Sequence, residues 1–313
     1  MIKIAAYTNG DIEVASCRLR SFYLFKKAEE FGLEILRNLS FKESLSCNCL
    51  HLQKIYTPQF ILQALLFRIL RKKVIFDIDD QPLLFKHKLA FFLLSFISSH
   101  ITVDTIFRKK YLSQYIPSRK VKVIKDVIDI NSDRKKYFLK RRLSNSGGML
   151  WIGHRDTLPS IEPFFNFLKG KERKMFVSTS LLKDDVLIKR YPDISFIDWK
   201  VDISFDPDIN ISFMILNHDK TVDSKAGYKS ENKMVTAIAS GLIPIVSASP
   251  AYEELAIKLD ANQIMFNEIN QINRVIDSLE VSWMEDFISK SQEYILKNFS
   301  NTVLLKHFKS LFF

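Results

Sequence analysis

Short apolar segments alternate along this chain with longer stretches in which apolar residues recur every three or four positions. The first pattern is typical of buried strands and the second of amphipathic helices. In the first half, the apolar runs predict strands at residues 2–7, 33–36, 55–56, 74–76, 101–103 and 121–124. Helices are predicted near residues 22–28, 60–70 and 105–115. Strands that alternate with helices in this way predict a parallel sheet covered by helices on both faces.

The second half repeats the alternation after a polar stretch, residues 144–148, whose composition is typical of a linker. Strands are predicted at residues 149–152, 174–177, 194–197, 213–216 and 243–246. Helices are predicted near residues 161–168, 181–190, 230–241 and 251–259, with two more within 283–313. We therefore expect an α/β protein of two domains, residues 1–146 and 147–313, with the cleft between them as the ligand site.

The start of the predicted helix at 230–241 carries an unusual charge. Ser230 is a good N-cap, yet Lys229 and Lys233 bracket a helix end whose dipole disfavours cations. Free backbone amides, the positive end of the helix and two ammonium groups together would bind an anion, most simply a phosphate. The alternative is that both lysines are solvated on the surface of a core helix.

A second candidate site follows the predicted strand at 74–76. Asp77, Asp79 and Asp80 lie at its carboxyl end, where open α/β sheets place functional groups. Three acids in four residues could bind a divalent metal, accept a proton or hold substrate hydroxyls. The alternative is that Asp79 or Asp80 caps the following helix. We prefer a substrate-handling role for at least one of them and predict both, with His154, as catalytic candidates.

Basic residues follow the first predicted strand of each half. Arg18 and Arg20 lie two positions apart in the first loop, and their planar guanidinium groups suit phosphates and carboxylates, unless they are a solvated pair. They are predicted to bind the acceptor or a phosphate. Gly153, His154 and Arg155 follow the strand at 149–152, where Arg155 could contact a diphosphate together with the two lysines. His154 could be a base, a ligand for a sugar hydroxyl, or a surface residue.

Charge is divided unevenly between the two halves. Residues 1–150 contain 27 Lys and Arg against 13 Asp and Glu, a net of +14, whereas the remainder has a net of −3. A basic half could meet nucleic acid, an anionic membrane or a phosphorylated substrate. Residues 60–70 and 89–97 combine apolar helical patterns with nearby lysines and arginines. Their apolar pattern predicts helices that pack in the core. Part of their surface is also a candidate for contact with anionic lipid.

Other classes of protein are disfavoured by what the sequence lacks. Neither G-x-G-x-x-G nor a P-loop signature occurs, which lowers the NAD, FAD and ATP-hydrolysis interpretations. The three cysteines imply no disulfide framework, and no second ligand pair accompanies Cys47 and Cys49, so no metal and no cofactor are predicted. The apolar run at 89–97 has about half of the ~20 residues that a membrane-spanning helix needs. No signal peptide is recognised, and we expect a cytoplasmic protein, soluble or peripheral on the inner face of the membrane.

Taken in order, these segments resemble GT-B-fold glycosyltransferases, in particular the GT4-like bacterial group that builds lipopolysaccharide, capsule and wall glycans. The resemblance extends over nearly the whole chain. Its most specific part runs from Lys229 through Lys233 to the apolar strand at 243–246. The other matching segments are residues 16–20, 74–80, 103–105 and 151–153.

The resemblance implies two tandem Rossmann-like domains, an N-terminal one for the acceptor and a C-terminal one for the nucleotide sugar, with the last helices crossing back to the N-terminal domain. It implies a retaining reaction without a metal, because cationic side chains and a helix terminus stabilise the leaving diphosphate. By position, the donor would be bound by Lys229, Ser230, Asn232 and Lys233, and its phosphates by Arg155. The group often carries two glutamates where this chain has Tyr228 and Thr236.

We therefore predict a glycosyltransferase that moves a sugar from a nucleotide-sugar donor to a hydroxyl of a glycolipid, oligosaccharide or polysaccharide acceptor. One alternative is a non-catalytic module that binds nucleic acid or another polyanion through the basic half. The phenylalanines have core-like spacing rather than the spacing of exposed stacking platforms, so no nucleic acid is expected as a partner. A second alternative is a sugar-nucleotide epimerase of the same fold.

Overall fold

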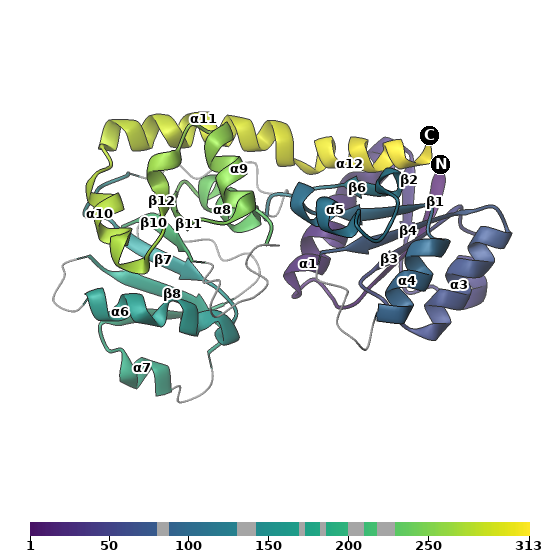
Figure 1. Ribbon diagram of the computed structural model, residues 1–313, viewed down its shortest axis with the longest axis horizontal. Helices are drawn as coiled ribbons and strands as arrows, with labels where there is room; N and C mark the ends of the chain where they lie inside the picture. The colour runs from purple at the N-terminus through teal and green to yellow at the C-terminus, as the bar shows by residue number, and fades with distance from the viewer. Residues whose placement is uncertain (80–87, 130–141, 169–172, 182–185, 200–209, 218–228) are drawn as a thin grey trace. The chain divides into compact units, whose positions relative to one another are not determined.

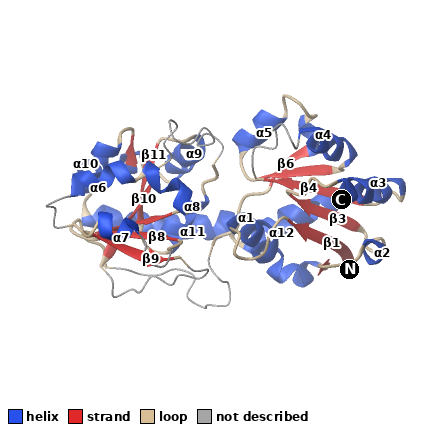
Figure 2. Ribbon diagram, turned by 90° about the horizontal axis from the view of Figure 1, so that it is seen from below, coloured by secondary structure: helices blue, strands red, loops and turns tan. Residues whose placement is uncertain are grey.

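The structure is a computed structural model that describes residues 1–79, 88–129, 142–168, 173–181, 186–199, 210–217 and 229–313. The chain divides into two compact units. Unit 1 consists of residues 1–129 and 297–313, and unit 2 of residues 130–296. Each unit is built around its own parallel sheet (Figures 1 and 2).

In its described residues, unit 1 has a six-stranded sheet in the order β2-β1-β3-β4-β5-β6. Its strands are β1 (Ile2–Thr8), β2 (Leu33–Leu36), β3 (Cys49–Gln53), β4 (Lys73–Ile78), β5 (His100–Val103) and β6 (Val121–Val123). Its helices are α1 (Ala15–Cys17), the π-helical η1 (Arg18–Tyr23), the 3-10 helix η2 (Leu24–Phe31), α2 (Phe41–Ser44), α3 (Pro58–Ile69), α4 (Lys88–Ile97), α5 (Ile106–Leu112), η4 (Ser118–Lys120), α12 (Asn301–Lys309) and η9 (Ser310–Phe312). The order of strands reverses between β1 and β3, which puts helices on both faces of the sheet.

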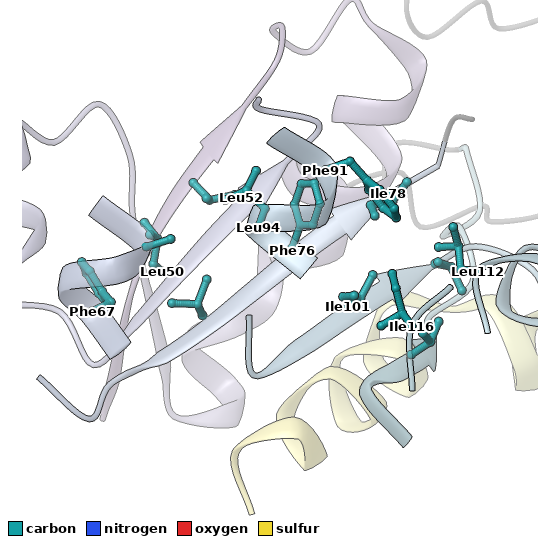
Figure 3. Packing of buried hydrophobic residues seen from close by; sticks show 14 of the residues in the cluster. Leu50, Leu52, Phe67, Phe76, Ile78, Phe91, Leu94, Ile101, Leu112 and Ile116 are labelled. Atoms are coloured by element: carbon teal, nitrogen blue, oxygen red, sulfur yellow. The ribbon is translucent and has the colours of Figure 1, made fainter. Parts of the chain in front are cut away.

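One face of this sheet is covered by α3, α4 and α5. Leu50 of β3 and Phe76 of β4 pack there against Phe67 of α3 and Phe91 of α4, and all four side chains are fully buried (Figure 3). Each such side chain contributes roughly 1.5–3 kcal/mol when it leaves water. On the other face, η2 and α12 pack over β3. The paired hydrophobic faces hold the strands in place and leave the carboxyl edge of the sheet to polar residues.

In its described residues, unit 2 has a six-stranded sheet in the order β12-β11-β10-β7-β8-β9. Its strands are β7 (Gly148–Ile152), β8 (Met175–Thr179), β9 (Ile194–Asp198), β10 (Ile211–Leu216), β11 (Ile243–Ser247) and β12 (Met265–Phe266). Its helices are η5 (Arg155–Ser160), α6 (Glu162–Leu168), α7 (Val186–Arg190), α8 (Asn232–Ala239), α9 (Pro250–Lys258), η7 (Asn262–Ile264), η8 (Ile269–Gln271), α10 (Ile272–Asp277) and most of α11 (Val281–Phe299). This is the strand order of a Rossmann fold, with its switch point between β7 and β10.

The chain ends in unit 1. Phe299, the last residue of α11, accepts a hydrogen bond from the Ile128 amide at 3.2 Å, and the Leu311 carbonyl accepts one from Lys73 Nζ at 2.8 Å. Phe308 of α12 is buried against η2 and β3. The two helices predicted within residues 283–313 are α11 and α12. Within the described part of the chain, no helix has both the length and the apolar character needed to cross a bilayer.

The α/β prediction with parallel sheets is confirmed, and two local predictions for unit 1 are wrong. The strand predicted at 55–56 is β3, at Cys49–Gln53. All five of its residues are buried, but His51 and Gln53 interrupt the apolar run that normally marks an interior strand. The loop predicted around Arg18 and Arg20 is helical from Ala15 onward. Its polar side chains point to internal partners, so polarity there is no sign of a loop.

The predicted linker at 144–148 is a packed turn inside unit 2. The Ser144 amide donates to Ser212 Oγ at 3.0 Å, and a β-carbon at Gly147 would overlap the same serine side chain. Gly148 is already the first residue of β7. The two units divide after residue 129 rather than after 146, and residues 130–141 lie outside the described residues. A tight turn and a flexible linker have the same glycine- and serine-rich composition, because both need small residues.

Candidate functional sites at the two sheet edges

The carboxyl ends of the parallel strands in unit 1 meet at one edge of the sheet, where a buried ion pair joins η1 to β4. Arg20 Nε donates to Asp77 Oδ2 at 2.8 Å, and its Nη2 donates to Asp77 Oδ1. Arg20 Nη1 donates to Asp126 Oδ1 at 2.9 Å, and the Thr102 hydroxyl donates to Asp77. Arg20 and Asp77 are both almost completely buried. The acceptors of the guanidinium therefore come from two other segments of the chain, β4 and residues 124–126 after β6.

Electrostatics in this cluster favour the ionised forms. Burial alone would raise the pKa of Asp77, but the Arg20 guanidinium outweighs burial and holds that pKa below its ordinary value. Burial would likewise lower the pKa of Arg20, and Asp77 instead raises it. A pair this deeply buried is costly to break, since removing Arg20 would strand the Asp77 charge in a medium of low dielectric constant, and removing Asp77 would leave Asp126 as the one carboxylate paired with Arg20 in the described structure.

Arg18, the other arginine predicted to face the ligand, is also buried in unit 1. Its Nε and Nη2 donate to the two carboxylate oxygens of Asp129 at 2.9 and 2.8 Å, and its Nη1 donates to the Ile12 carbonyl at 3.0 Å. Arg108 is paired in the same manner with Asp104, four residues earlier. The carboxylates that these arginines bind belong to the protein itself, whereas the sequence analysis expected Arg18 and Arg20 to bind the acceptor or a phosphate.

Asp79 follows β4 near the switch point between β1 and β3. Its carboxylate lies 3.4 Å from Lys54 Nζ, which also donates to Ser16 Oγ at 3.0 Å. Asp80, the second predicted catalytic acid of this segment, lies outside the described residues. Lys54 was not singled out by the sequence analysis, because a lone lysine after an unrecognised strand gives no signal. The geometry makes Asp79 a carboxylate balanced by a cation at the switch point.

In unit 2, Lys233 brings together two segments that the sequence analysis selected separately. Its Nζ donates to the Ile152 carbonyl at 2.8 Å and lies 5.8 Å from the centre of the Trp151 ring. Ile152 ends β7, and α8 follows β10, so this contact lies at the switch point of the sheet, where ligands of such folds bind. Burial, with the nearby charge of Lys229, lowers the pKa of Lys233 to about 8.

Helix α8 begins two residues later than predicted, at Asn232, and Glu231 rather than Ser230 is the residue at its N-cap. No side chain caps the helix, and its first intrahelical bond runs from the Val235 amide to the Glu231 carbonyl. Ser230 as the N-cap is therefore wrong. The amides at 232–234 precede that bond, so the start of α8 keeps the backbone donors and the positive dipole end that an anion would need.

Two side-chain oxygens on α8 have no hydrogen-bond partner in the described structure. They are Asn232 Oδ1 and Thr236 Oγ1, which are buried and stand one helical turn apart on the same side of the helix. Ser178 and Thr179, at the end of β8, have buried hydroxyls in the same condition. The sequence analysis missed Ser178 and Thr179, since serine and threonine in a strand carry no distinctive pattern. For Thr236 the available signal is its spacing of four residues from Asn232, which puts the two on one side of a helix.

The segment after β7 is held mainly by its own contacts. A β-carbon at Gly153 would clash with the Trp151 indole, so this glycine allows the indole to pack closely against the backbone. His154 accepts a hydrogen bond from the Asp156 amide at Nδ1, over 3.3 Å, and its side chain is 69% exposed. Arg155 Nη1 donates to the Ser180 carbonyl at 3.5 Å. Lys229 is exposed and Ser230 is half-buried.

Metal-ligating side chains do not gather in the part of the chain that is described. No group of three or more His, Cys, Asp or Glu residues there is arranged to hold a metal ion. The three cysteines are free and buried, and burial raises the pKa of the Cys17 thiol. Cys47 and Cys49 form no disulfide with each other.

No protein-family model matches the sequence, and no curated protein matches it either. Solved structures do match over nearly the whole chain. HepE of Anabaena, solved with UDP and glucose, is 13% identical, with a TM-score of 0.68 and 99% of both chains covered. An α-glucosyltransferase solved with UDP and a 13-mer DNA is 11% identical, with a TM-score of 0.65 and 99% of both chains covered. MnaA of S. aureus, solved with UDP, is 12% identical, with a TM-score of 0.52, and covers 96% of this chain and 92% of its own. At such low identity the likeness shows the fold, which is the two-domain α/β GT-B fold.

Proposed function

We propose that this protein is a glycosyltransferase that moves a sugar from a nucleotide-sugar donor to a hydroxyl of a glycolipid or polysaccharide, in the assembly of lipopolysaccharide, capsule or wall glycan. The proposal includes a retaining reaction without a metal. The observation that carries it is Lys233, a cation held at the switch point of unit 2 beside the start of α8. The GT-B fold, shared with structures solved in complex with UDP, adds support.

The contacts of Lys233 fit a cation that would pair with a bound anion. Its recorded partners are a backbone carbonyl and an aromatic face, and no carboxylate among the described residues pairs with it. Burial without a counter-charge is what lowers its pKa. A diphosphate beside Lys233 and the α8 amides would restore the charged form and would be stabilised as it leaves the sugar.

The rest of the donor would lie against groups that now lack partners. Asn232 Oδ1 and Thr236 Oγ1 are buried acceptors, and the hydroxyls of a sugar or a ribose are donors of matching chemistry. We propose that Lys229, Ser230 and Arg155 complete the donor site. An orphaned buried oxygen costs about 1–3 kcal/mol, which a hydroxyl ligand would relieve.

For catalysis we propose Asp79, Asp80 and His154, as the sequence analysis does, and Asp80 lies outside the described residues. His154 is exposed, and because its Nδ1 accepts from the backbone, Nε2 is the atom left to hold or move a proton at a sugar hydroxyl. Asp79 is a carboxylate balanced by Lys54 and suits the acceptor hydroxyl. For Arg18 and Arg20 we propose a positioning role, since their guanidinium groups bind carboxylates of the protein.

We also propose that unit 1 attaches peripherally to the cytoplasmic membrane through α3 and α4, which would bring a lipid-linked acceptor to the enzyme. These two helices are neighbours (Figure 1). They bury Phe67 and Phe91 in the core and carry exposed apolar side chains at helical spacing on the opposite side. The outward residues are Leu62, Leu65 and Ile69 on α3, and Leu89, Leu93 and Phe96 on α4. Ile69 is 66%, Leu89 73% and Phe96 85% exposed.

Cations surround the exposed end of α4. Lys120 Nζ donates to the Phe96 carbonyl at 2.8 Å and lies 5.7 Å from the Phe96 ring centre. Burial lowers the pKa of Lys120, and the charges of Arg68 and Arg119 lower it further, so the three cations are neighbours. Apolar side chains ringed by cations fit an anionic bilayer, where each basic residue adds roughly 1 kcal/mol of attraction.

The donor site is tested by thermal unfolding with a panel of UDP-, GDP-, dTDP-, ADP- and CMP-sugars. We expect one nucleotide to raise the melting temperature of the wild type and to quench Trp151, which is next to Lys233. Lys233→Ala should lose both effects. Lys174→Ala is the matched control, because Lys174 is exposed and precedes β8 at the opposite edge of the same sheet. A panel without any stabilising nucleotide, or an equal shift in Lys233→Ala, would refute the donor site.

Membrane attachment is tested by flotation with vesicles of phosphatidylglycerol and phosphatidylethanolamine, and with vesicles of phosphatidylcholine alone. Phe96→Ser should weaken binding to the anionic vesicles by about tenfold, as expected from the loss of one buried aromatic side chain. Val186→Ser, at a residue of unit 2 that is 72% exposed, should leave binding unchanged. Equal binding of all three proteins, or equal binding to both kinds of vesicle, would argue against this surface.

A further inference from the structure

A cavity of about 370 Å³ lies in unit 1 between η1–η2 and the edge strand β2, on a different side of the sheet from α3 and α4. Arg37, the residue after β2, lines it together with Phe22, Phe25, Ile35 and Lys26. Glu29 and Glu30 line it as well, near the end of η2. Because this helical segment runs antiparallel to β2, the acids belong to the amino edge of the sheet, and Arg37 to the carboxyl edge.

Arg37 differs from the other inward-facing arginines of unit 1 in its partners. Arg18, Arg20 and Arg108 each form an ion pair with an aspartate. The side chain of Arg37 donates to Ser21 Oγ at 2.9 Å and to the Ser21 carbonyl at 3.0 Å, and both acceptors are neutral. No carboxylate in the described part of unit 1 is paired with Arg37. A hydrogen bond to a neutral acceptor satisfies a donor and leaves the charge uncompensated.

The surroundings of Arg37 orient its guanidinium and disfavour an uncompensated charge. Its guanidinium carbon stands 4.3 Å from the centre of the Phe22 ring, so the aromatic ring fixes the plane of the guanidinium. Burial lowers the pKa of Arg37, and the one ionisable group that opposes this is Cys17, whose own thiol burial keeps neutral. Arginine has five N–H donors, and two are used by Ser21, which leaves part of the fork for a ligand in the cavity.

We propose that this cavity binds a small organic anion, whose phosphate or carboxylate pairs with Arg37 and whose apolar body packs against Phe22 and Ile35. The residues that line the cavity favour both the anionic group and the apolar body of this ligand. The guanidinium of Arg37 suits a planar or tetrahedral oxyanion. The aromatic and aliphatic side chains favour a ligand with an apolar body over a bare ion. The site belongs entirely to unit 1, and it does not depend on the proposed donor site of unit 2.

Phenyl phosphate is the probe, and hydrogen–deuterium exchange is the readout, because exchange assigns binding to a segment. We expect phenyl phosphate to protect peptides within residues 22–37 in the wild type. Arg37→Gln keeps a donor for Ser21 and should raise the half-saturating concentration about tenfold or more, as for the loss of a charge-assisted bond. Arg119→Gln, at an exposed arginine of the same unit, should leave it unchanged. Inorganic phosphate and benzyl alcohol should each protect this segment at least tenfold less effectively.

Three results would overturn the proposal. One is an absence of protection at residues 22–37 in the wild type, which decides the matter even if the variant fails to fold. Another is equal protection in Arg37→Gln, and the third is inorganic phosphate acting as well as phenyl phosphate. Lys233→Ala separates this site from the donor site: it should lose the response to nucleotide sugars and keep the phenyl phosphate response at residues 22–37.

Discussion

His51 makes the stability of unit 1 depend on pH in a way that can be calculated. Its side chain is buried at the centre of β3 and packs edge-on against the rings of Phe25 and Phe308 at 5.3 and 5.7 Å, which also contact each other. Burial lowers its pKa from 6.5 to about 4, with Arg20 and Arg37 acting in the same direction and Asp77 against them. The folded protein therefore holds His51 neutral, while the unfolded chain takes up a proton below about pH 6.5.

The sign and size follow from that difference. Where the unfolded state binds more protons than the folded state, the free energy of unfolding falls as the pH falls. For His51 the loss begins near pH 6.5 and ends near pH 4, because below that value the folded state is protonated as well. A difference of about 2.5 pKa units corresponds to about 3 kcal/mol in total, a large share of the ~5–15 kcal/mol that stabilises a domain.

The assay compares urea unfolding of the wild type and His51→Leu between pH 7.5 and 4.5. Leucine has a similar volume, and His51 Nδ1 has no hydrogen-bond partner to lose, so we expect a small change at pH 7.5. At pH 4.5 the variant should be more stable than the wild type by between about 2 and 3 kcal/mol, relative to pH 7.5. Other groups also titrate in this range. Burial raises the pKa of Asp104, which stabilises the fold as the pH falls, but its contribution cancels in the difference between the two proteins.

The chain supplies internal controls for this measurement. All three tryptophans, Trp151, Trp199 and Trp283, belong to unit 2, so fluorescence follows that unit while circular dichroism follows both. The fluorescence transition should be unaffected by His51→Leu. His307→Leu, at an exposed histidine of α12, should behave as the wild type. The reasoning is refuted if the wild type and His51→Leu lose stability in parallel from pH 7.5 to 4.5.

Three further predictions concern the two sheet edges. Asp77→Asn should lower the free energy of unfolding of unit 1 by about 3–5 kcal/mol in urea titrations followed by circular dichroism, because it leaves Arg20 buried beside a neutral amide; a loss below about 1 kcal/mol would contradict the buried pair. Gly153→Ala should destabilise unit 2 by about 1–3 kcal/mol in fluorescence-detected melts, since its methyl group meets the Trp151 indole; an unchanged melt would refute that contact. Affinity for the nucleotide identified in the panel should fall as the pH rises through about 8, the pKa of Lys233, in calorimetric titrations; Lys233→Arg should remove the dependence, and a dependence that persists would assign it to another group.

The sequence predicts the fold well because strand and helix periodicities are local. The apolar runs that became β1, β4, β7 and β11 are visible without any knowledge of their neighbours. β3 was not predicted because His51 and Gln53 interrupt its apolar run, and tertiary contacts allow an interior strand to bury them. The turn at 144–148 was mistaken for a linker because its reason lies in Ser212, which is 68 residues away from Ser144 in the chain.

The sites were harder to predict because a site depends on which charges the protein neutralises for itself. Arg20 and Asp77 are 57 positions apart, and Arg18 and Asp129 are 111 apart, so no local pattern shows that these arginines are already paired. The contact between Lys233 and Ile152 spans 81 positions. The sequence analysis joined those two segments by position, when it placed Arg155 with the two lysines at a diphosphate, and the resemblance to GT-B enzymes implies the same donor site.

These pairings change what the charge of the two halves implies. The net charge of +14 made the basic half a candidate for binding anionic partners. Several of its arginines, however, are paired with aspartates of the same unit. Among the described residues of this half, the cations that we propose for ligands are Arg37, which has neutral partners, and those around Phe96. The other half has a net charge of −3, and its described residues include a half-buried lysine, Lys233, whose ammonium contacts a carbonyl and an indole ring. An anion is therefore drawn to a cation that the fold leaves uncompensated, and net charge is a poor guide to where that cation lies.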